Sequence, residues 1–279
     1  MKSFRRFVIR WSRLLLGLYV VIVIAAMLFE TTLIFVGSGP SWRPLKDKQF
    51  QAVSFPSASD QTMFCWWLPP PDAQSPVVLF FNGNGGNACG SETLALQMQK
   101  HLKCGVLLMD YPGYGKSEGT PSEASCYANA TGAMNWLIET KNIPANRIVL
   151  LGLSLGGGVA VETATKYPVR GVALVSTYTS LPAAAKSRFP FLPTHWLMRN
   201  RFDSLSKIGT VSAPVFIAHG TDDRTIPYSQ GETLFAAANE PKQFLRMPGK
   251  GHNDCLSPEL FVELKRFLDH TNSLVRIEQ

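Results

Sequence analysis

Apolar residues divide the chain into two parts with different patterns. Residues 14–36 form a long apolar run that only Glu30-Thr31-Thr32 interrupts. From about residue 49 onwards, short apolar runs bounded by Gly, Pro or polar residues alternate with longer helical stretches. Short runs of this kind are typical of strands buried on both faces of a sheet. Their alternation with helices predicts a mostly parallel sheet that helices cover on both faces.

The second part of the chain supplies the expected elements of this α/β fold. We expect strands at residues 51–55, 63–68, 77–81, 106–110, 148–151, 171–176, 215–219 and 244–247. The first two are expected to form an antiparallel lead-in to the sheet. Helices are expected from about residue 88 to 100, after residue 154, and at 123–140, 230–238 and 257–270. Residues 178–212 break the alternation with mixed aromatic and basic residues, which predicts a short cap inserted over the sheet.

The apolar run near the amino terminus is long enough to cross a membrane. As a helix, residues 14–36 would span about 35 Å, more than the ~30 Å of a bilayer's hydrocarbon core. Glu30 lies near one end, from which its carboxylate could reach the interface, and Trp11 and Trp42 lie where an aromatic belt is expected. We therefore expect one transmembrane signal-anchor helix at residues 14–36.

Two other interpretations of this run are less favoured. A cleaved signal peptide needs a shorter apolar core that ends at a small-x-small site. The late candidate, Gly37-Ser38-Gly39, lies beyond the long run and is followed by Pro40. A buried core helix is disfavoured because the run is apolar all round.

Charge is concentrated at the amino terminus. The formal net charge is +7, and five positive residues lie among the first 13 without an acid: Lys2, Arg5, Arg6, Arg10 and Arg13. Removing these five from +7 leaves +2 for residues 14–279. The basic end predicts a cytoplasmic amino terminus, with the body of the protein on the periplasmic, lumenal or extracellular side. The near-neutral body carries no basic stripe, so we expect no nucleic-acid partner.

Cysteine and glycine spacing argue against metal and cofactor sites. The five cysteines are scattered without a C-x-x-C pair, which disfavours zinc binding, and their odd number leaves at least one thiol free in a monomer. The glycine-rich stretch 83–86 lacks the G-x-G-x-x-G spacing of a dinucleotide site and the Gly-Lys-Ser/Thr of a Walker loop. We therefore expect no metal and no cofactor.

The chemistry of the chain is predicted to centre on Gly152-Leu153-Ser154-Leu155-Gly156. This G-x-S-x-G pattern follows an apolar strand and precedes a helix. In that context it predicts a nucleophile elbow, a tight turn that exposes a serine hydroxyl above the sheet. A glycine-rich turn without chemistry is the alternative interpretation, so partners for the serine elsewhere in the chain are decisive.

Candidate partners follow two later strands. A serine hydroxyl becomes a good nucleophile when a histidine takes its proton, and a carboxylate orients that histidine. Asp222 and Asp223 follow the strand that ends at His219, and His252 follows the last strand. Both loops lie on the same carboxyl edge of the sheet as Ser154, where open α/β sheets bind ligands.

These stretches together resemble the α/β-hydrolase superfamily, and most closely the membrane-anchored Bem46-like serine hydrolases. The resemblance covers roughly residues 45–270. It rests on the elbow and on the stretches Asn82-Gly83-Asn84-Gly85-Gly86-Asn87, Asp110-Tyr111-Pro112-Gly113-Tyr114-Gly115-Lys116-Ser117, His219-Gly220-Thr221-Asp222-Asp223 and Gly251-His252-Asn253. One departure is Asn82, where the family usually has histidine at a position that orients the loop.

The resemblance implies an α/β-hydrolase fold with a catalytic triad. It makes Ser154 the nucleophile, His252 the base and Asp223 the orienting acid, with Asp222 as the alternative acid. The backbone N–H groups of Leu155 and Asn84 would form the oxyanion hole. The implied activity is cleavage of carboxylic esters or thioesters. The aromatic and basic cap beside an anchored domain predicts apolar acyl groups, from lipids or from acylated surface molecules. A serine peptidase of the same fold and a non-catalytic anchored binding protein are the alternatives.

The remaining candidate residues are expected to be structural. Asp110 is expected to fix the turn that follows it, and His219 to hydrogen-bond within its own loop. His101, His195 and His270 are expected at the surface or in the cap, and Asp254 is poorly placed to serve His252. The expected organisation is a basic tail (1–13), the anchor (14–36), a linker (37–48), the hydrolase domain (49–272) and a C-terminal tail (273–279).

Overall fold

A single eight-stranded sheet forms the centre of the computed structural model, which describes residues 2–39 and 41–277. The strands are β1 (Gln51–Pro56), β2 (Thr62–Leu68), β3 (Val77–Phe81), β4 (Gly105–Met109), β5 (Ile148–Leu153), β6 (Gly171–Val175), β7 (Val215–Gly220) and β8 (Lys242–Met247). Their order is β1-β2-β4-β3-β5-β6-β7-β8. The pairs β1–β2 and β2–β4 are antiparallel and all others are parallel. The predicted mostly parallel sheet with an antiparallel lead-in is confirmed.

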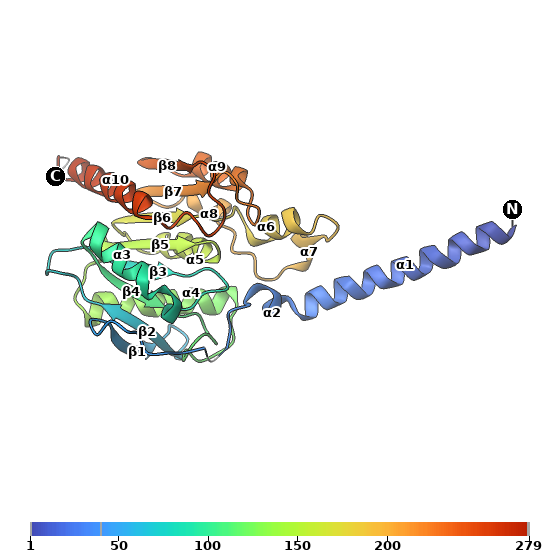
Figure 1. Cartoon of the computed structure of the whole chain (residues 1–279), viewed down its shortest axis with the longest axis horizontal. Coiled ribbons are helices and arrows are strands. Elements are labelled where there is room, and N and C mark those ends of the chain that lie inside the picture. Colours follow the sequence, from blue (N-terminus) through green and yellow to red (C-terminus); the bar gives the residue numbers. More distant parts are fainter. Residues whose placement is uncertain (1, 40, 278–279) are drawn as a thin grey trace.

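Helices cover both faces of this sheet (Figure 1). On one face lie α3 (Glu92–Leu102) and α10 (Pro258–Ile277), which share one apolar cluster with the sheet. The other face carries α4 (Glu123–Asn135), α5 (Leu155–Ala164), α8 (Leu205–Ile208) and α9 (Tyr228–Ala237), which share a second cluster. Strands β3, β4 and β6 are buried throughout, as their uninterrupted apolar sequences predict. The cap consists of α6 (Leu181–Arg188) and α7 (Thr194–Leu197).

Several helix boundaries differ from the sequence expectation for local reasons. The expected helix 123–140 begins at a capping box on Ser122 but changes to a π-helix at Trp136–Thr140. The wider turn accompanies Trp136 packing against Phe55 and Trp67, with ring centroids 5.0 and 5.7 Å away. The helix expected from about residue 88 starts as a 3-10 turn, Ala88–Ser91. Residues 273–277, expected as a tail, continue α10; residues 1, 40, 278 and 279 of the expected tails and linker lie outside the described residues.

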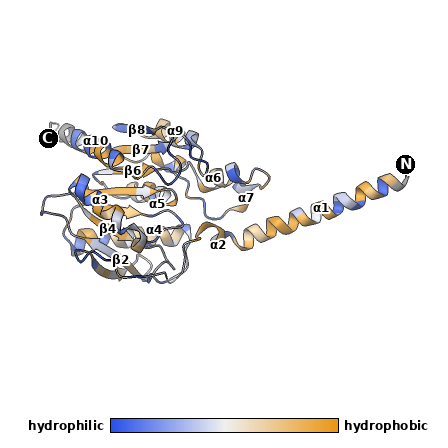
Figure 2. Cartoon of the chain, in the orientation of Figure 1, coloured by the Kyte–Doolittle hydropathy of each residue, from blue (hydrophilic) through white to orange (hydrophobic). Residues whose placement is uncertain are grey.

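The amino-terminal segment forms two helices, not one. Helix α1 (Lys2–Leu28) extends away from the body, and α2 (Glu30–Ile34) lies at its edge (Figure 1). Residues Phe4–Leu28 are long and apolar enough to cross a membrane, and none of the span's most apolar 18-residue stretch is buried. Figure 2 shows the apolar residues concentrated in the half of α1 nearest the body.

The apolar run therefore does not form one continuous helix over residues 14–36, because α1 ends at Leu28 and the last residues of the run belong to the body. The basic residues expected as a tail are part of α1, while Ile34 and Phe35 are buried in the body. Glu30 does not reach toward an interface: it is only 4% exposed. Its Oε1 accepts hydrogen bonds from the backbone N–H groups of Arg199 and Asn200, both at 2.9 Å, and Oε2 accepts from Arg199 Nε at 3.0 Å. These bonds draw the end of the apolar run into the fold.

The segment expected as a linker is also part of the body. Trp42 stacks on Trp66 at a centroid distance of 6.1 Å, and Lys116 Nζ lies 3.6 Å above the Trp42 ring. The carboxylate of Glu92 accepts from the backbone N–H groups of Lys46 and Asp47. Residues 42–47 therefore pack on the surface of the sheet domain.

Candidate active site

Ser154 occupies a strained turn between β5 and α5. Its backbone has φ 51° and ψ −115°, a conformation that costs a non-glycine residue energy. The turn is possible because Gly152 and Gly156 flank it. A Cβ at Gly152 would lie 2.4 Å from the Gly156 oxygen, and a Cβ at Gly156 would lie 2.2 Å from the Phe81 oxygen. The sharp turn aims the Ser154 side chain at the carboxyl edge of the sheet.

Three side chains from distant parts of the chain meet at this edge. His252 Nε2 lies 3.0 Å from Ser154 Oγ, and His252 Nδ1 lies 2.7 Å from Asp223 Oδ2. An ionised carboxylate only accepts hydrogen bonds, so the pair places the ring proton on Nδ1. Nε2 is then free to accept the proton of the Ser154 hydroxyl. The structure thus brings together the three side chains that the sequence singled out.

The loop around Asp223 holds its carboxylate ionised. Burial by itself would raise the pKa of Asp223. Hydrogen bonds from His219, His252 and the Ile226 N–H more than offset this and hold the pKa well below its usual value. Oδ1 accepts from the N–H groups of Thr225 and Ile226 at 2.8 and 2.9 Å, which fixes the orientation of Oδ2. His219, fully buried, also contacts the Ile226 carbonyl at 3.0 Å, within its own loop as expected.

The alternative acids lie elsewhere. Asp222 is exposed and accepts from Thr221 Oγ1, and Asp254 accepts from the Gly251 N–H. Asp110 is buried, and its Oδ1 accepts from the Ala88 N–H at 2.7 Å. Its role is structural as expected, but it anchors the helix after β3 instead of bonding the turn that follows it. Burial raises the pKa of Asp110 to about 6, and the bond from Ala88 opposes that rise.

The contacts of His101 and His195 place these two histidines away from Ser154. His101 stacks on Phe261 with ring centroids 6.4 Å apart, and His195 is exposed beside Arg201 in the cap. Neither contributes to the cavity around Ser154 described below. Among the described residues, no cluster of three or more His, Cys, Asp or Glu side chains could hold a metal ion. The five cysteines are buried free thiols.

Leu155 and Asn84 both line the cavity next to Ser154. Leu155 is the first residue of α5, where a backbone N–H has no partner within the helix. Asn84 is held firmly: its carbonyl accepts from Tyr114 Oη at 2.7 Å and from the Gly37 N–H at 3.0 Å. Its side-chain Nδ2 donates to the Ile34 carbonyl at 2.8 Å. The segment after α2 therefore supports the glycine-rich loop, a contact that the sequence did not predict.

A large cavity of about 1190 Å³ surrounds these groups. It exceeds the roughly 300–1,000 Å³ of common ligand pockets. Ser154 and His252 line it, together with the glycine-rich loop and apolar residues of the cap, and Glu30, Arg188 and Arg224 add charged groups to the lining. Unexpectedly, α1 and α2 contribute Ile22, Ala26, Leu33 and Ile34. In the sequence, the feature that could have indicated this contact with the body is Glu30, a charged residue inside an apolar run.

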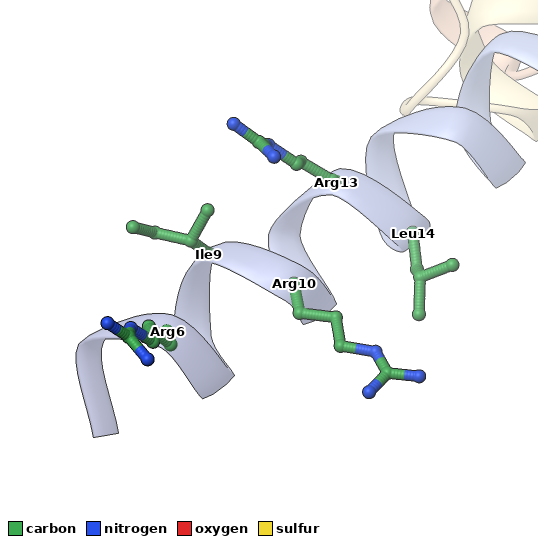
Figure 3. Close-up of a pocket in the computed structure, with 5 residues that line it drawn as sticks. All are labelled: Arg6, Ile9, Arg10, Arg13 and Leu14. Atoms are coloured by element: carbon green, nitrogen blue, oxygen red, sulfur yellow. The ribbon is translucent and has the colours of Figure 1, made fainter. Parts of the chain in front are cut away.

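A second depression, of about 420 Å³, lies on the first half of α1. It is lined by Arg6, Ile9, Arg10, Arg13 and Leu14, which Figure 3 shows projecting from this single helix. No other element forms a wall, so it is a feature of the exposed helix surface and not an enclosed site. Its three arginines are the basic residues expected beside a membrane span.

Comparison with known proteins links this geometry to a family. The profile described as the alpha/beta hydrolase family matches residues 78–205. The uncharacterized protein Rv2307c of Mycobacterium tuberculosis is 38% identical over 213 residues, 74% of each chain. The alpha/beta hydrolase domain-containing protein aho-3 of Caenorhabditis elegans is 30% identical over 214 residues, 76% of this chain and 63% of that protein.

Solved structures show the same fold. The Pyrococcus furiosus esterase Pf2001 superposes with a TM-score of 0.69 at 15% identity, covering 84% of this chain and 97% of the esterase. At this identity the likeness concerns the fold alone.

Proposed function

Since this chain belongs to the alpha/beta hydrolase family, we propose that it is a membrane-anchored serine hydrolase that cleaves carboxylic esters or thioesters with apolar acyl groups. The observation that carries the proposal is the continuous hydrogen-bond path from Ser154 Oγ through the His252 ring to Asp223. A hydroxyl, a base and an orienting acid in this order are what nucleophilic catalysis by serine requires.

In the first half of the proposed reaction, His252 Nε2 takes the proton of Ser154 as Oγ attacks the acyl carbonyl carbon. The tetrahedral intermediate carries its negative charge on the former carbonyl oxygen. Backbone N–H groups of Leu155 and Asn84 stabilise that charge, together with the amino-terminal end of α5. His252 then gives the proton to the departing alkoxide or thiolate. The acyl group remains on Ser154 as an ester.

The second half releases the acyl group with the same residues. His252 takes a proton from water, whose oxygen attacks the acyl carbon of the Ser154 ester. The same two N–H groups stabilise the second intermediate. His252 returns the proton to Ser154 as the carboxylic acid leaves. Asp223, ionised because of its hydrogen bonds, stabilises the imidazolium that forms in both halves.

The nature of the cavity supports an apolar acyl group. Its walls include Leu181, Phe189, Leu192, Leu197 and Met198 from the cap. Burial of each methylene of an acyl chain against such a wall contributes about 0.8 kcal/mol of binding. A long chain would therefore bind far more tightly than a short one.

Membrane anchoring by α1 is the second part of the proposal. The span Phe4–Leu28 has the required length and composition, and none of its most apolar stretch is buried within the described part of the chain. The arginines at its amino-terminal half favour a cytoplasmic amino terminus. The hydrolase domain would then lie on the outer side of the membrane.

Labelling by a fluorophosphonate probe tests the catalytic proposal. We expect the probe to label the full-length protein in membranes, and Ser154→Ala and His252→Gln to abolish labelling. Asp222→Asn is the matched control, because Asp222 lies outside the hydrogen-bond path, and it should label normally. Labelling that survives in Ser154→Ala would refute Ser154 as the nucleophile. Hydrolysis of p-nitrophenyl esters of increasing chain length would then define the acyl preference.

A further inference from the structure

We propose that the tip of the cap inserts into the bilayer leaflet beside α1, so that the catalytic cavity opens sideways into lipid and takes substrates that reside in the membrane. This inference rests on the proposed hydrolase and anchor functions. The cap tip is defined here as residues 186–197, from the end of α6 through α7. Its occupant is an anionic phospholipid bilayer.

The position of the cap tip relative to α1 is the first observation. Tyr19 Oη donates a hydrogen bond to the Phe191 carbonyl at 2.9 Å. Tyr19 lies nine residues before Leu28, the end of α1, which corresponds to about 13 Å along a helix. Figure 1 shows α6 and α7 beside the end of α1 that joins the body. If α1 crosses the membrane and leaves it near Leu28, the cap tip contacts a part of α1 that lies inside the membrane.

Several backbone polar groups of the cap tip are paired or absent, as an apolar environment requires. Irregular backbone in lipid is costly unless its polar groups are paired. Pro190 and Pro193 have no N–H groups. The Phe189 N–H donates to the Ala185 carbonyl and the Leu192 N–H to the Phe189 carbonyl. The Pro190 carbonyl accepts from Lys186 Nζ, and the Phe191 carbonyl accepts from Tyr19.

The side chains of the cap tip match a lipid surface in both polarity and charge. Phe189, Phe191 and Trp196 are 46%, 59% and 86% exposed, an unusual exposure for aromatic residues that touch water alone. The stretch 181–201 carries Lys186, Arg188, Arg199 and Arg201 and no acid, and of these four Arg199 is paired with Glu30 of α2. Aromatic residues with neighbouring basic residues are the combination that binds the interface of an anionic membrane.

The cavity wall completes the argument. Ile22 and Ala26, both in the candidate span, line the same cavity as Ser154, and so do Phe189 and Phe191 of the cap tip. An acyl chain in the leaflet could therefore pass between α1 and the cap tip to Ser154 without entering water. The ester-bearing end would meet Ser154, while the rest of the amphiphile stayed in the bilayer.

Fluorescence quenching tests the insertion of the cap tip independently of catalysis. Native thiols are buried, so a cysteine placed at Phe191 or Trp196 can carry an environment-sensitive fluorophore. Gln74→Cys, on the exposed loop before β3 at the opposite edge of the sheet, is the control. In phosphatidylcholine–phosphatidylglycerol vesicles we expect a blue shift at 191 and 196, and loss of emission when the acyl chains are brominated. The probe at 74 should respond only to aqueous iodide.

Equal iodide quenching at positions 74, 191 and 196 would overturn insertion and would point to a protein or water at the cap tip. Fluorophosphonate labelling of the same samples reports the proposed catalysis separately. A protein that inserts but does not label would overturn the hydrolase function and the use of the cavity for membrane-resident substrates, while retaining the membrane contact.

Substrate access is tested by a pair of substitutions on α1. Ile22→Trp narrows the passage, whereas Ile24→Trp adds the same bulk about 200° away on the helix, outside the cavity lining. We compare hydrolysis of a long-chain fluorogenic ester embedded in the vesicle with that of a short water-soluble ester. Ile22→Trp should lower the ratio of these rates by about tenfold, and Ile24→Trp should leave it unchanged. An unchanged ratio in Ile22→Trp would refute access through the bilayer.

Discussion

Glu30, the first residue of α2, connects the amino-terminal helices to the cap, and replacing it should loosen the cap by an amount that depends on which oxygen is lost. Oε1 accepts from the N–H groups of Arg199 and Asn200 and from Asn200 Nδ2, whereas Oε2 pairs only with Arg199 Nε. Glu30→Ala removes both oxygens. Glu30→Gln keeps an oxygen in place of Oε1 and loses only the pairing of Oε2.

The structure allows the two costs to be worked out. Asn200 is buried, so Glu30→Ala leaves its backbone N–H and its side-chain amide without an acceptor. Two unpaired buried donors at about 1–3 kcal/mol each give a cost of about 4 kcal/mol. The Arg199 side chain is 74% exposed, so the loss of its ion pair in Glu30→Gln should cost about 1 kcal/mol or less.

Hydrogen exchange of the Arg199 and Asn200 amides in the full-length protein in lipid nanodiscs measures the difference. A loss of about 4 kcal/mol in the free energy of local opening accelerates exchange by about 1,000-fold, and a loss of about 1 kcal/mol by about fivefold. Amides of β3 should exchange at the wild-type rate in both variants, as an internal control. Equal acceleration in Glu30→Ala and Glu30→Gln would refute the assignment of the stabilisation to Oε1.

Three further results are expected. Asp223→Asn should lower kcat for ester hydrolysis by about 10⁴-fold, because the amide favours the wrong His252 tautomer, while Asp222→Asn should keep the wild-type rate. Burial raises the pKa of Asp110 from 3.8 to about 6, so stability present below pH 4 falls by about 3 kcal/mol as the pH rises through 6. Asp110→Asn should flatten this part of the curve in denaturant titrations, and an unchanged slope would contradict the pKa shift. Gly156→Ala should abolish probe labelling and lower Tm, because its Cβ would lie 2.2 Å from a β3 carbonyl oxygen, while Gly17→Ala, with open space around it, should label normally.

Ser154, Asp223 and His252 could be singled out from sequence because each lies at, or within five residues of, the end of a recognisable strand. Their neighbours in the chain are apolar runs, and parallel strands bring their carboxyl ends to one edge. For these residues, the local sequence pattern therefore predicts their position in the fold. The choice of Asp223 over Asp222 came from the family resemblance, and the structure separates them by burial.

The break after Leu28 could not be predicted in the same way. The apolar run continues to Val36, and local hydropathy favours one helix through that point. The groups that bury Glu30 belong to Arg199 and Asn200, 169 and 170 residues further along the chain. Long-range partners of this kind leave no local pattern. The same is true of Asp110, whose bonding partner depends on how two loops meet.

The hydrogen bond from Asn84 to Ile34 has a practical consequence for preparing the hydrolase domain without α1. A truncation after Val36, at the end of the apolar run, would delete the carbonyl that steadies the glycine-rich loop and the carboxylate that steadies the cap. A cut just before Glu30 removes α1 while leaving both supports attached to the hydrolase domain. The appropriate cleavage point is thus set by tertiary contacts and not by where hydrophobicity ends.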